Sequence, residues 1–172
     1  MKSETIDTAR RGFLIASGGV AAAAALPTAT TSAAEGMVTR AARSTPPALM
    51  PAATREAIRK LIGTANLSRG RITLDLPAVV DNGNVVALAV KVDSPMTEGD
   101  HVRAVHVLTE KNPQPNVLSI HFKPQAGVAS FATRIRLADT QTVLAIAEMN
   151  DGSFWYETAD SVVTISACLE EI

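Results

Sequence analysis

From residue 71 onward, hydrophobic and polar residues alternate with a period of two, the pattern of strands that bury one face. The alternation is regular in 86–92, where Val86, Leu88, Val90 and Val92 share one side. The strands predicted in this way are 72–76, 86–92, 101–110, 117–124, 131–137, 142–149, 154–156 and 161–167. About seven short strands separated by turn residues predict an all-β fold, an immunoglobulin-like antiparallel β-sandwich over residues 71–167.

Residues 51–62 instead carry their apolar side chains at helical spacing. Pro51 suits the first turn of a helix, Arg59 and Lys60 suit the last turn, and Gly63 is a common stop signal. The sequence therefore predicts one short α-helix in front of the sandwich. Its basic side chains are expected to form a solvated face, with docking to an acidic partner as the alternative.

Residues 81–84 read Asp-Asn-Gly-Asn and lie between the first two strong strand patterns. Asn82 followed by Gly83 supplies the positive φ angles that a tight hairpin turn requires. We therefore expect the strand at 86–92 to run antiparallel to the strand at 72–76.

The N-terminus has the pattern of an export signal. Arg10 and Arg11 precede Phe13 closely and lead into a weakly apolar stretch at 15–26, which is shorter than the roughly 20 residues of a membrane-spanning helix. We expect residues 1–34 to be a twin-arginine signal peptide that delivers the protein to the periplasm, with no membrane attachment after cleavage. An uncleaved anchor is the alternative. Residues 35–50, rich in Ala, Thr, Ser and Pro, are predicted to be a flexible linker.

Composition narrows the picture further. The formal net charge of −1 and the absence of a basic patch argue against nucleic-acid binding. Aromatic residues make up only 3% of the chain, so the core of a single domain over 51–172 must be built from aliphatic side chains.

The chain has one cysteine, Cys168, close to the C-terminal Ile172. A single thiol forms no internal disulfide, so in an oxidising compartment it stays free, pairs with another molecule or reacts. It could also be a small hydrophobe that completes the last strand. If that strand continued to Leu169, Cys168 would lie on the same face as Ser166, the more polar one.

Other candidate sites are weaker. His101, His106 and His121 lack the closely spaced acidic or sulfur ligands of a metal site, and no His or Met follows Cys168 as a blue-copper site needs. The sequence contains no nucleophile elbow, phosphate loop or dinucleotide fingerprint, so we expect no cofactor, no metal and no catalytic residue.

For two further groups of side chains, the sequence allows either a structural role or a binding role. Arg134 and Arg136 share the polar face of one predicted strand, as a solvated face or as an anion-attracting patch. Residues 154–156, Phe-Trp-Tyr, place Trp155 on one face and their other two rings on the opposite face, either in the core or at a subunit interface.

Five segments of the strand region stand out together: 93–97 (Asp-Ser-Pro-Met-Thr), 110–113 (Glu-Lys-Asn-Pro), 121–122 (His-Phe), 133–137 (Thr-Arg-Ile-Arg-Leu) and 147–155 (Ala-Glu-Met-Asn-Asp-Gly-Ser-Phe-Trp). In these segments the chain resembles SoxY, the sulfur-carrier subunit of the bacterial thiosulfate-oxidising (Sox) system. The resemblance implies a non-catalytic periplasmic carrier that binds sulfur intermediates covalently through Cys168. It also implies a heterodimer with a SoxZ-like subunit, and as partners a c-type cytochrome conjugating enzyme, a sulfate-releasing hydrolase and a sulfane dehydrogenase.

The C-terminal arm, residues 166–172, departs from the family pattern. The family motif is Gly-Gly-Cys-Gly-Gly, whereas Ser166 and Ala167 precede Cys168 here and Leu169 and Glu170 follow it. The missing glycines reduce the conformational freedom of the arm, and Glu170 adds negative charge beside the thiol. The alternative function is therefore a divergent, non-covalent binding subunit that has lost the carrier arm.

Overall fold

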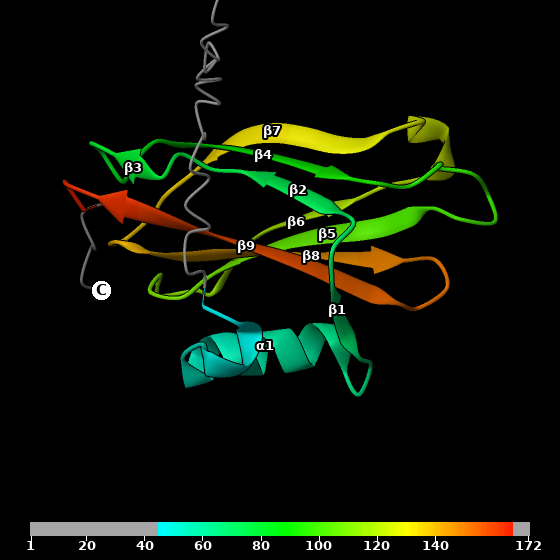
Figure 1. Ribbon diagram of the computed structural model, residues 1–172, viewed down its shortest axis with the longest axis horizontal. Helices are drawn as coiled ribbons and strands as arrows, with labels where there is room; N and C mark the ends of the chain where they lie inside the picture. Colours follow the sequence, from blue (N-terminus) through cyan, green and yellow to red (C-terminus); the bar gives the residue numbers. More distant parts are fainter. Residues whose placement is uncertain (1–44, 167–172) are drawn as a thin grey trace, which may run out of the picture. The chain divides into compact units, whose positions relative to one another are not determined.

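The computed structural model describes residues 45–166 of the chain. These residues form a two-sheet sandwich with one helix packed outside it (Figure 1). The strands are β1 (Leu67–Arg69), β2 (Ile72–Asp75), β3 (Val79–Val80), β4 (Val86–Val92), β5 (Val102–Thr109), β6 (Asn116–His121), β7 (Ala129–Ile135), β8 (Gln141–Met149) and β9 (Phe154–Val163). The helix is α1 (Ala52–Ile62), and short 3₁₀ turns occur at η1 (Pro47–Leu49) and η2 (Pro124–Ala126).

The main core lies between the two sheets. One sheet has the order β1-β9-β8-β5-β6, with β3 also paired to β9, and the other has the order β2-β4-β7. The alternation seen in the sequence is realised in β4, whose Val86, Leu88, Val90 and Val92 are at most 2% exposed. They pack against buried aliphatic side chains of β5 and β8, such as Val105. The predicted fold class is confirmed.

A second, smaller core lies under α1, on the outer face of the larger sheet. Ile58 of the helix packs there with Met50, and the sheet contributes Leu144, Ile146 and Phe154. Figure 1 shows α1 on the side of this sheet that faces away from β2, β4 and β7. The central strands are thus covered on both faces, which explains why β8 is buried almost throughout instead of alternating.

The helix matches its prediction within one residue. Pro51 is the N-cap, and Gly63 ends the helix with φ at 61°, a left-handed value that glycine adopts without strain. Within the described residues, no helix has the length and hydrophobicity to cross a membrane.

The connection between β2 and β4 differs from the predicted tight hairpin. The two strands are antiparallel, as expected, with Ile72 opposite Val92. However, neither Asn82 nor Gly83 has a positive φ. Between these strands the chain crosses to the other sheet, where β3 pairs in parallel with the end of β9. Pro77 lies two residues after the end of β2, and a proline there is the one feature of the local sequence that indicates an interruption of the strand.

The C-terminal strand also differs from its prediction. Residues 154–156 and 161–163 belong to one continuous strand, β9, which ends at Val163 instead of reaching residue 167. The parity argument that placed Cys168 beside Ser166 therefore does not hold. In addition, β1 and β3 both pair in parallel with β9, so the larger sheet is mixed.

Part of the predicted linker is folded. Residues 45–50 contain the 3₁₀ turn η1, and Met50 is only 1% exposed beneath α1. The predicted signal peptide, 1–34, and the linker residues 35–44 lie outside the described residues.

Candidate functional site

The predicted attachment residue Cys168 and its neighbours Ala167 and Leu169 lie outside the described residues. Ser166 is described and is exposed. The structure thus defines the base from which the arm starts, residues 163–166, and the surroundings of that base.

The base is held by β3 and the residues after it. The amide of Thr164 donates to the carbonyl of Val80 at 3.0 Å, and the amide of Ile165 donates to the carbonyl of Asp81 at 3.2 Å. The amide of Gly83 in turn donates to the carbonyl of Ile165 at 2.8 Å. These bonds continue the parallel pairing beyond the end of β9 and fix the backbone as far as Ile165.

This anchoring limits the reach of the thiol. Cys168 follows Ile165 by three residues, so their Cα atoms are at most about 11 Å apart even in a fully extended chain. Whatever reacts with Cys168 must therefore approach the end of the sandwich that carries Ile165.

Asn112 organises the loops at this end. Its side chain donates to the carbonyl of Arg136 at 2.8 Å and accepts from the amide of Ala138 at 2.9 Å. It also accepts from the side-chain amide of Gln141 at 2.9 Å. The amide of Leu137 donates to the carbonyl of Gly83, which links this loop to the clamp around the arm base.

Charges at this end are partly compensated. Lys111 and Asp139 form an ion pair at 2.8 Å. The hydrogen bond from Lys111, together with one from the amide of Thr140, lowers the pKa of the Asp139 carboxyl. Arg136 is exposed and has no ion-pair partner among the described residues. Arg134 is exposed on β7 and lines a shallow hollow with Asp75. The structure leaves both arginines available to solvent.

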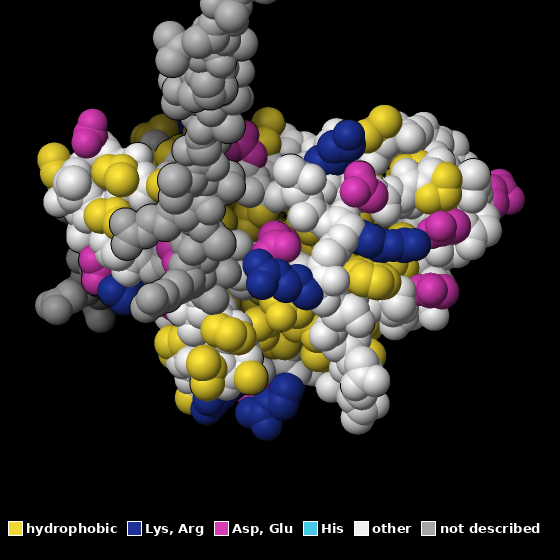
Figure 2. All heavy atoms as spheres, in the orientation of Figure 1, with side chains coloured by type: hydrophobic (Ala, Val, Ile, Leu, Met, Phe, Trp, Pro, Cys, Tyr) yellow, Lys and Arg dark blue, Asp and Glu magenta, His cyan; other side chains and the backbone are white. Residues whose placement is uncertain are grey.

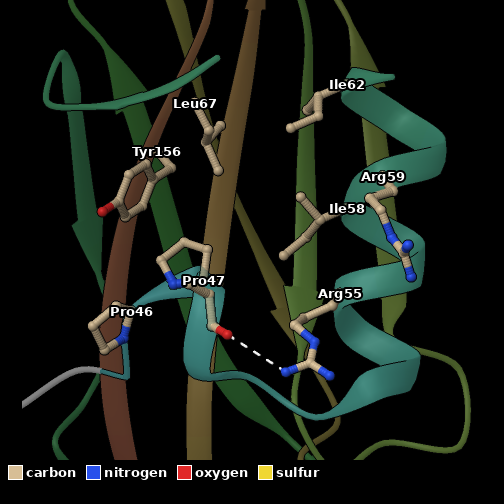
Figure 3. A pocket seen from close by; sticks show the side chains of 9 residues that line it. Pro46, Pro47, Arg55, Ile58, Arg59, Ile62, Leu67 and Tyr156 are labelled. Atoms are coloured by element: carbon tan, nitrogen blue, oxygen red, sulfur yellow. Dashed lines mark hydrogen bonds between the residues drawn. The ribbon is translucent and has the colours of Figure 1, made fainter. Parts of the chain in front are cut away.

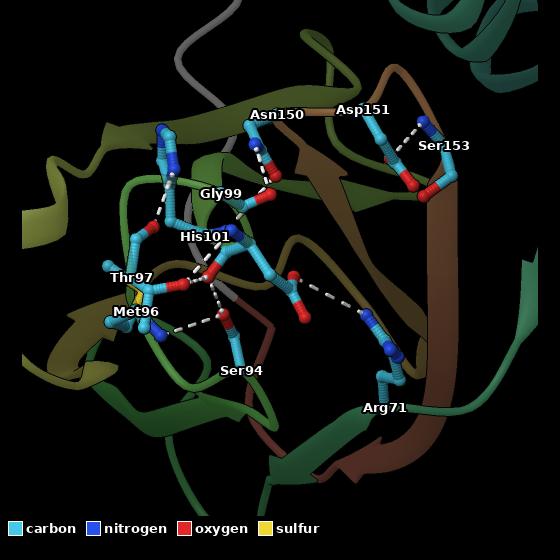
Figure 4. A network of polar contacts seen from close by, with 10 residues as sticks. Arg71, Ser94, Met96, Thr97, Gly99, His101, Asn150, Asp151 and Ser153 are labelled. Atoms are coloured by element: carbon cyan, nitrogen blue, oxygen red, sulfur yellow. Dashed lines mark hydrogen bonds and ion pairs between the residues drawn. The ribbon is translucent and has the colours of Figure 1, made fainter.

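Four of the five family-like segments lie at opposite ends of the sandwich, two at each end. Segments 110–113 and 133–137 meet near the arm base through Asn112 and Arg136. At the other end, Figure 4 shows segment 93–97 packed in a polar network with the turn that starts at Asn150. Within these segments, Asn112 and Asn150 hold the loops at the two ends.

That second network is built on short local bonds. The amide of Met96 donates to Ser94 Oγ at 3.2 Å, and the amide of Thr97 donates to the carbonyl of Asp100 at 3.0 Å. Asn150 joins the loop to the β8–β9 turn, since its side chain donates to the carbonyl of Gly99 at 2.9 Å. Met96 has a left-handed φ of 51° and is buried, so this network holds a conformation that non-glycine residues rarely adopt.

The structure brings two of the three histidines together. The rings of His106 and His121 are 6.3 Å apart and nearly perpendicular. His106 Nδ1 is 2.8 Å from Ser119 Oγ, and burial lowers the pKa of His106, an effect that His121 reinforces and Glu148 opposes. His101 instead contacts the carbonyl of Thr97. The described residues contain no group of three or more His, Cys, Asp or Glu that could hold a metal ion.

The aromatic group at the start of β9 is divided between the two cores. Trp155 packs into the main core, with the guanidinium of Arg71 5.2 Å from its ring centroid. Phe154 is buried under α1, and Tyr156 packs at the margin of the same cluster. Phe154 and Trp155 therefore pack in the hydrophobic cores, which is the first of the two alternatives predicted for this group. Tyr156 instead lines a surface groove.

That groove lies between η1 and α1 and has a volume of about 570 Å³ (Figure 3). Ile58, Ile62 and Leu67 give it an apolar floor, and Arg55 and Arg59 contribute guanidinium groups. Arg55 also donates to the carbonyl of Ala48 at 3.5 Å. The groove could hold an apolar group with a negative charge at its margin.

Sequence reasoning missed the role of β3 and the residues that follow it. The sequence pattern predicts no strand at Val79 and Val80, and it predicts only a turn at residues 81–84. The break at Pro77 followed by two valines was the available signal. It gave no information on pairing with a strand about 80 residues later.

Comparison with known proteins identifies the family. The family described as "Sulfur oxidation protein SoxY" matches residues 58–168, well over half of the chain. No curated protein matches the chain.

The fold is shared with a solved SoxY. The sulfur carrier protein SoxY from Chlorobium limicola f thiosulfatophilum superposes with a TM-score of 0.55 and 21% identity, covering 64% of this chain and 96% of that one. A superoxide reductase (neelaredoxin) from Ignicoccus hospitalis has a TM-score of 0.49 and 15% identity, covering 55% of this chain and 80% of that one. With its family match over residues 58–168 and a sandwich shared with a solved SoxY, this chain belongs to the SoxY family of sulfur oxidation proteins.

Proposed function

We propose that this protein is a periplasmic sulfur carrier that binds intermediates of thiosulfate oxidation covalently on Cys168. The observation that carries the proposal is that the family match extends to residue 168, the chain's one cysteine. The clamp that ends at Ile165 supports it, because a fixed base presents the following residues at one end of the sandwich.

The chemistry begins with an oxidative conjugation. The Cys168 thiol loses its proton, and its sulfur forms a bond to the outer sulfur of thiosulfate. This S–S bond formation releases an electron pair, which a c-type cytochrome partner accepts. A hydrolase then uses water to cleave the terminal S–SO₃ bond, releasing sulfate and leaving a persulfide on Cys168. The carrier supplies the thiol and its position, and the partner proteins supply the catalysis.

The remaining elements of the proposal concern location and assembly. The twin-arginine pattern of residues 1–34 supports export to the periplasm. Family membership supports a heterodimer with a SoxZ-like subunit and successive contacts with the cytochrome, the hydrolase and a sulfane dehydrogenase.

The test is the intact mass of the mature protein, purified from thiosulfate-fed host cells and measured before and after a thiol reductant. We expect an adduct that contains additional sulfur, is removed by the reductant and is absent from Cys168→Ser. Thiosulfate-dependent growth should also be lost in Cys168→Ser. A thiol that stays unmodified in cells actively oxidising thiosulfate would overturn covalent carriage.

One observation favours a second candidate. Leu169 and Glu170 stand where the family motif has two glycines, which would suit a subunit that binds partners without carrying sulfur. In the same experiment that candidate predicts an unmodified Cys168, and Cys168→Ser would then leave growth on thiosulfate intact.

A further inference from the structure

Exposed hydrophobic side chains are concentrated around the arm base. Six large hydrophobic residues are strongly exposed among those described, and four of them lie in β3, the residues after it and the end of β9. These four are Val79 at 61%, Val85 at 59%, Val162 at 47% and Ile165 at 65% exposed, and we call them the collar. Scattered exposed valines are normal, but a group at one site marks an interaction surface.

Backbone pairing places Val79 beside Val162, and a backbone hydrogen bond links the segments that carry Val85 and Ile165. Val79 and Val162 are direct partners in the parallel β3–β9 register, so their side chains lie side by side on one face. Ile165 is bonded through its carbonyl to Gly83, two residues before Val85. Figure 2 shows hydrophobic side chains at the surface of this end of the domain, where β3 lies in Figure 1. The collar residues therefore lie on the segments next to the point from which the arm leaves.

The length of chain beyond the base determines what must contact the collar. The Cα of Cys168 lies within about 11 Å of that of Ile165, and its side chain adds about 3 Å. Enzyme active sites are concave, so their reacting atoms lie below a surrounding rim. For the reacting atom of such an active site to contact Cys168, the rim of the enzyme must therefore contact the surface around the arm base.

We propose that the collar is the docking surface for the enzymes that load and unload Cys168, and that it receives an apolar rim around their active-site entrance. This inference rests on the proposed function. Four aliphatic side chains are far fewer than a stable interface requires, so the contact is transient. A short-lived contact suits a carrier that must leave one enzyme before it meets the next.

The test compares Val79→Asp/Val162→Asp with Val128→Asp. Val128 is also exposed, at 54%, but lies beside η2, outside the collar, so it controls for a surface charge in place of a valine. Each variant replaces the native copy in the host, and the loaded fraction of Cys168 is followed by intact mass after thiosulfate is added. Alkylation of the purified, reduced protein by iodoacetamide reports the accessibility of the thiol to a small reagent.

We expect loading to be about tenfold slower in the collar variant and unchanged in Val128→Asp, with alkylation within about twofold of native in both. Loading of the collar variant at the native rate would overturn the docking surface and leave the proposed function intact. Faster alkylation of the collar variant would also overturn it, by showing that the chain's own C-terminal residues cover the collar. If the native protein is never loaded, the proposed function fails and the docking surface fails with it.

Discussion

The amide of Gly83 donates to the carbonyl of Ile165 at 2.8 Å, three residues before the one cysteine of the chain. This bond joins the segment after β3 to the end of β9 and turns the last described residues into an anchored base. The anchoring limits how far the thiol can lie from Ile165.

Asn112→Ala should destabilise the arm end of the sandwich. The substitution removes three hydrogen bonds and leaves the amide of Ala138, which is buried, without its partner. We expect a loss of about 1–3 kcal/mol in the free energy of unfolding, measured by urea denaturation. Gln114→Ala, an exposed position in the same connection, should lose less than about 0.5 kcal/mol. Equal effects of the two substitutions would contradict the organising role of Asn112.

Met50→Ala should show that residues just before α1 belong to the folded domain. Met50 is 1% exposed in the core under the helix, so its truncation leaves a cavity that costs about 2–5 kcal/mol. The adjacent Leu49 is 74% exposed, and Leu49→Ala should change stability by less than about 0.5 kcal/mol. The stability of the two variants is compared by thermal unfolding. If Met50→Ala did not change stability, residues 45–50 would have to be interpreted as a flexible linker after all.

His106 should make the domain less stable in acid. Burial lowers its pKa in the folded protein, with a smaller contribution from His121 and opposition from Glu148. The unfolded chain therefore binds the proton more readily, and stability is full above the unfolded-state pKa of about 6.5 and is lost as pH falls towards the folded-state pKa. Urea denaturation at pH 7.5 and 5.5 should show a smaller pH dependence in His106→Gln than in the native protein. His101→Gln, the control, should keep the native dependence, and an unchanged slope in His106→Gln would refute the assignment.

Gly152→Ala should strain the β8–β9 turn. Gly152 has a φ of +82°, and a Cβ there would meet no atom within 4 Å, so the cost comes from the backbone conformation alone. We expect a loss of about 1–2 kcal/mol. Gly99 also has open space around its Cα but no positive φ, and Gly99→Ala should be close to neutral in the same denaturation series. A neutral Gly152→Ala would mean that the turn relaxes to a different conformation.

Local periodicity predicted most elements correctly because each reflects burial of one face over a few residues. The alternation of Val86, Leu88, Val90 and Val92 requires a half-buried strand, and it became β4 with these side chains in the core. Gly63 ended the helix for an equally local reason, its left-handed φ. The same reasoning failed at Asn82-Gly83, because a turn-compatible pair does not exclude a longer connection through another sheet.

For the functional site, the sequence by itself determined the one thiol, its position at residue 168, and the family-like segments. Only the tertiary structure decided that residues of those segments hold loops at two ends, that β3 clamps β9, and that Val79 lies beside Val162. Pairing between residues about 80 positions apart depends on register and on packing between sheets. A local pattern of hydrophobic and polar residues contains no information on register or on packing between sheets. The residues around the arm base could therefore be identified only from the tertiary structure.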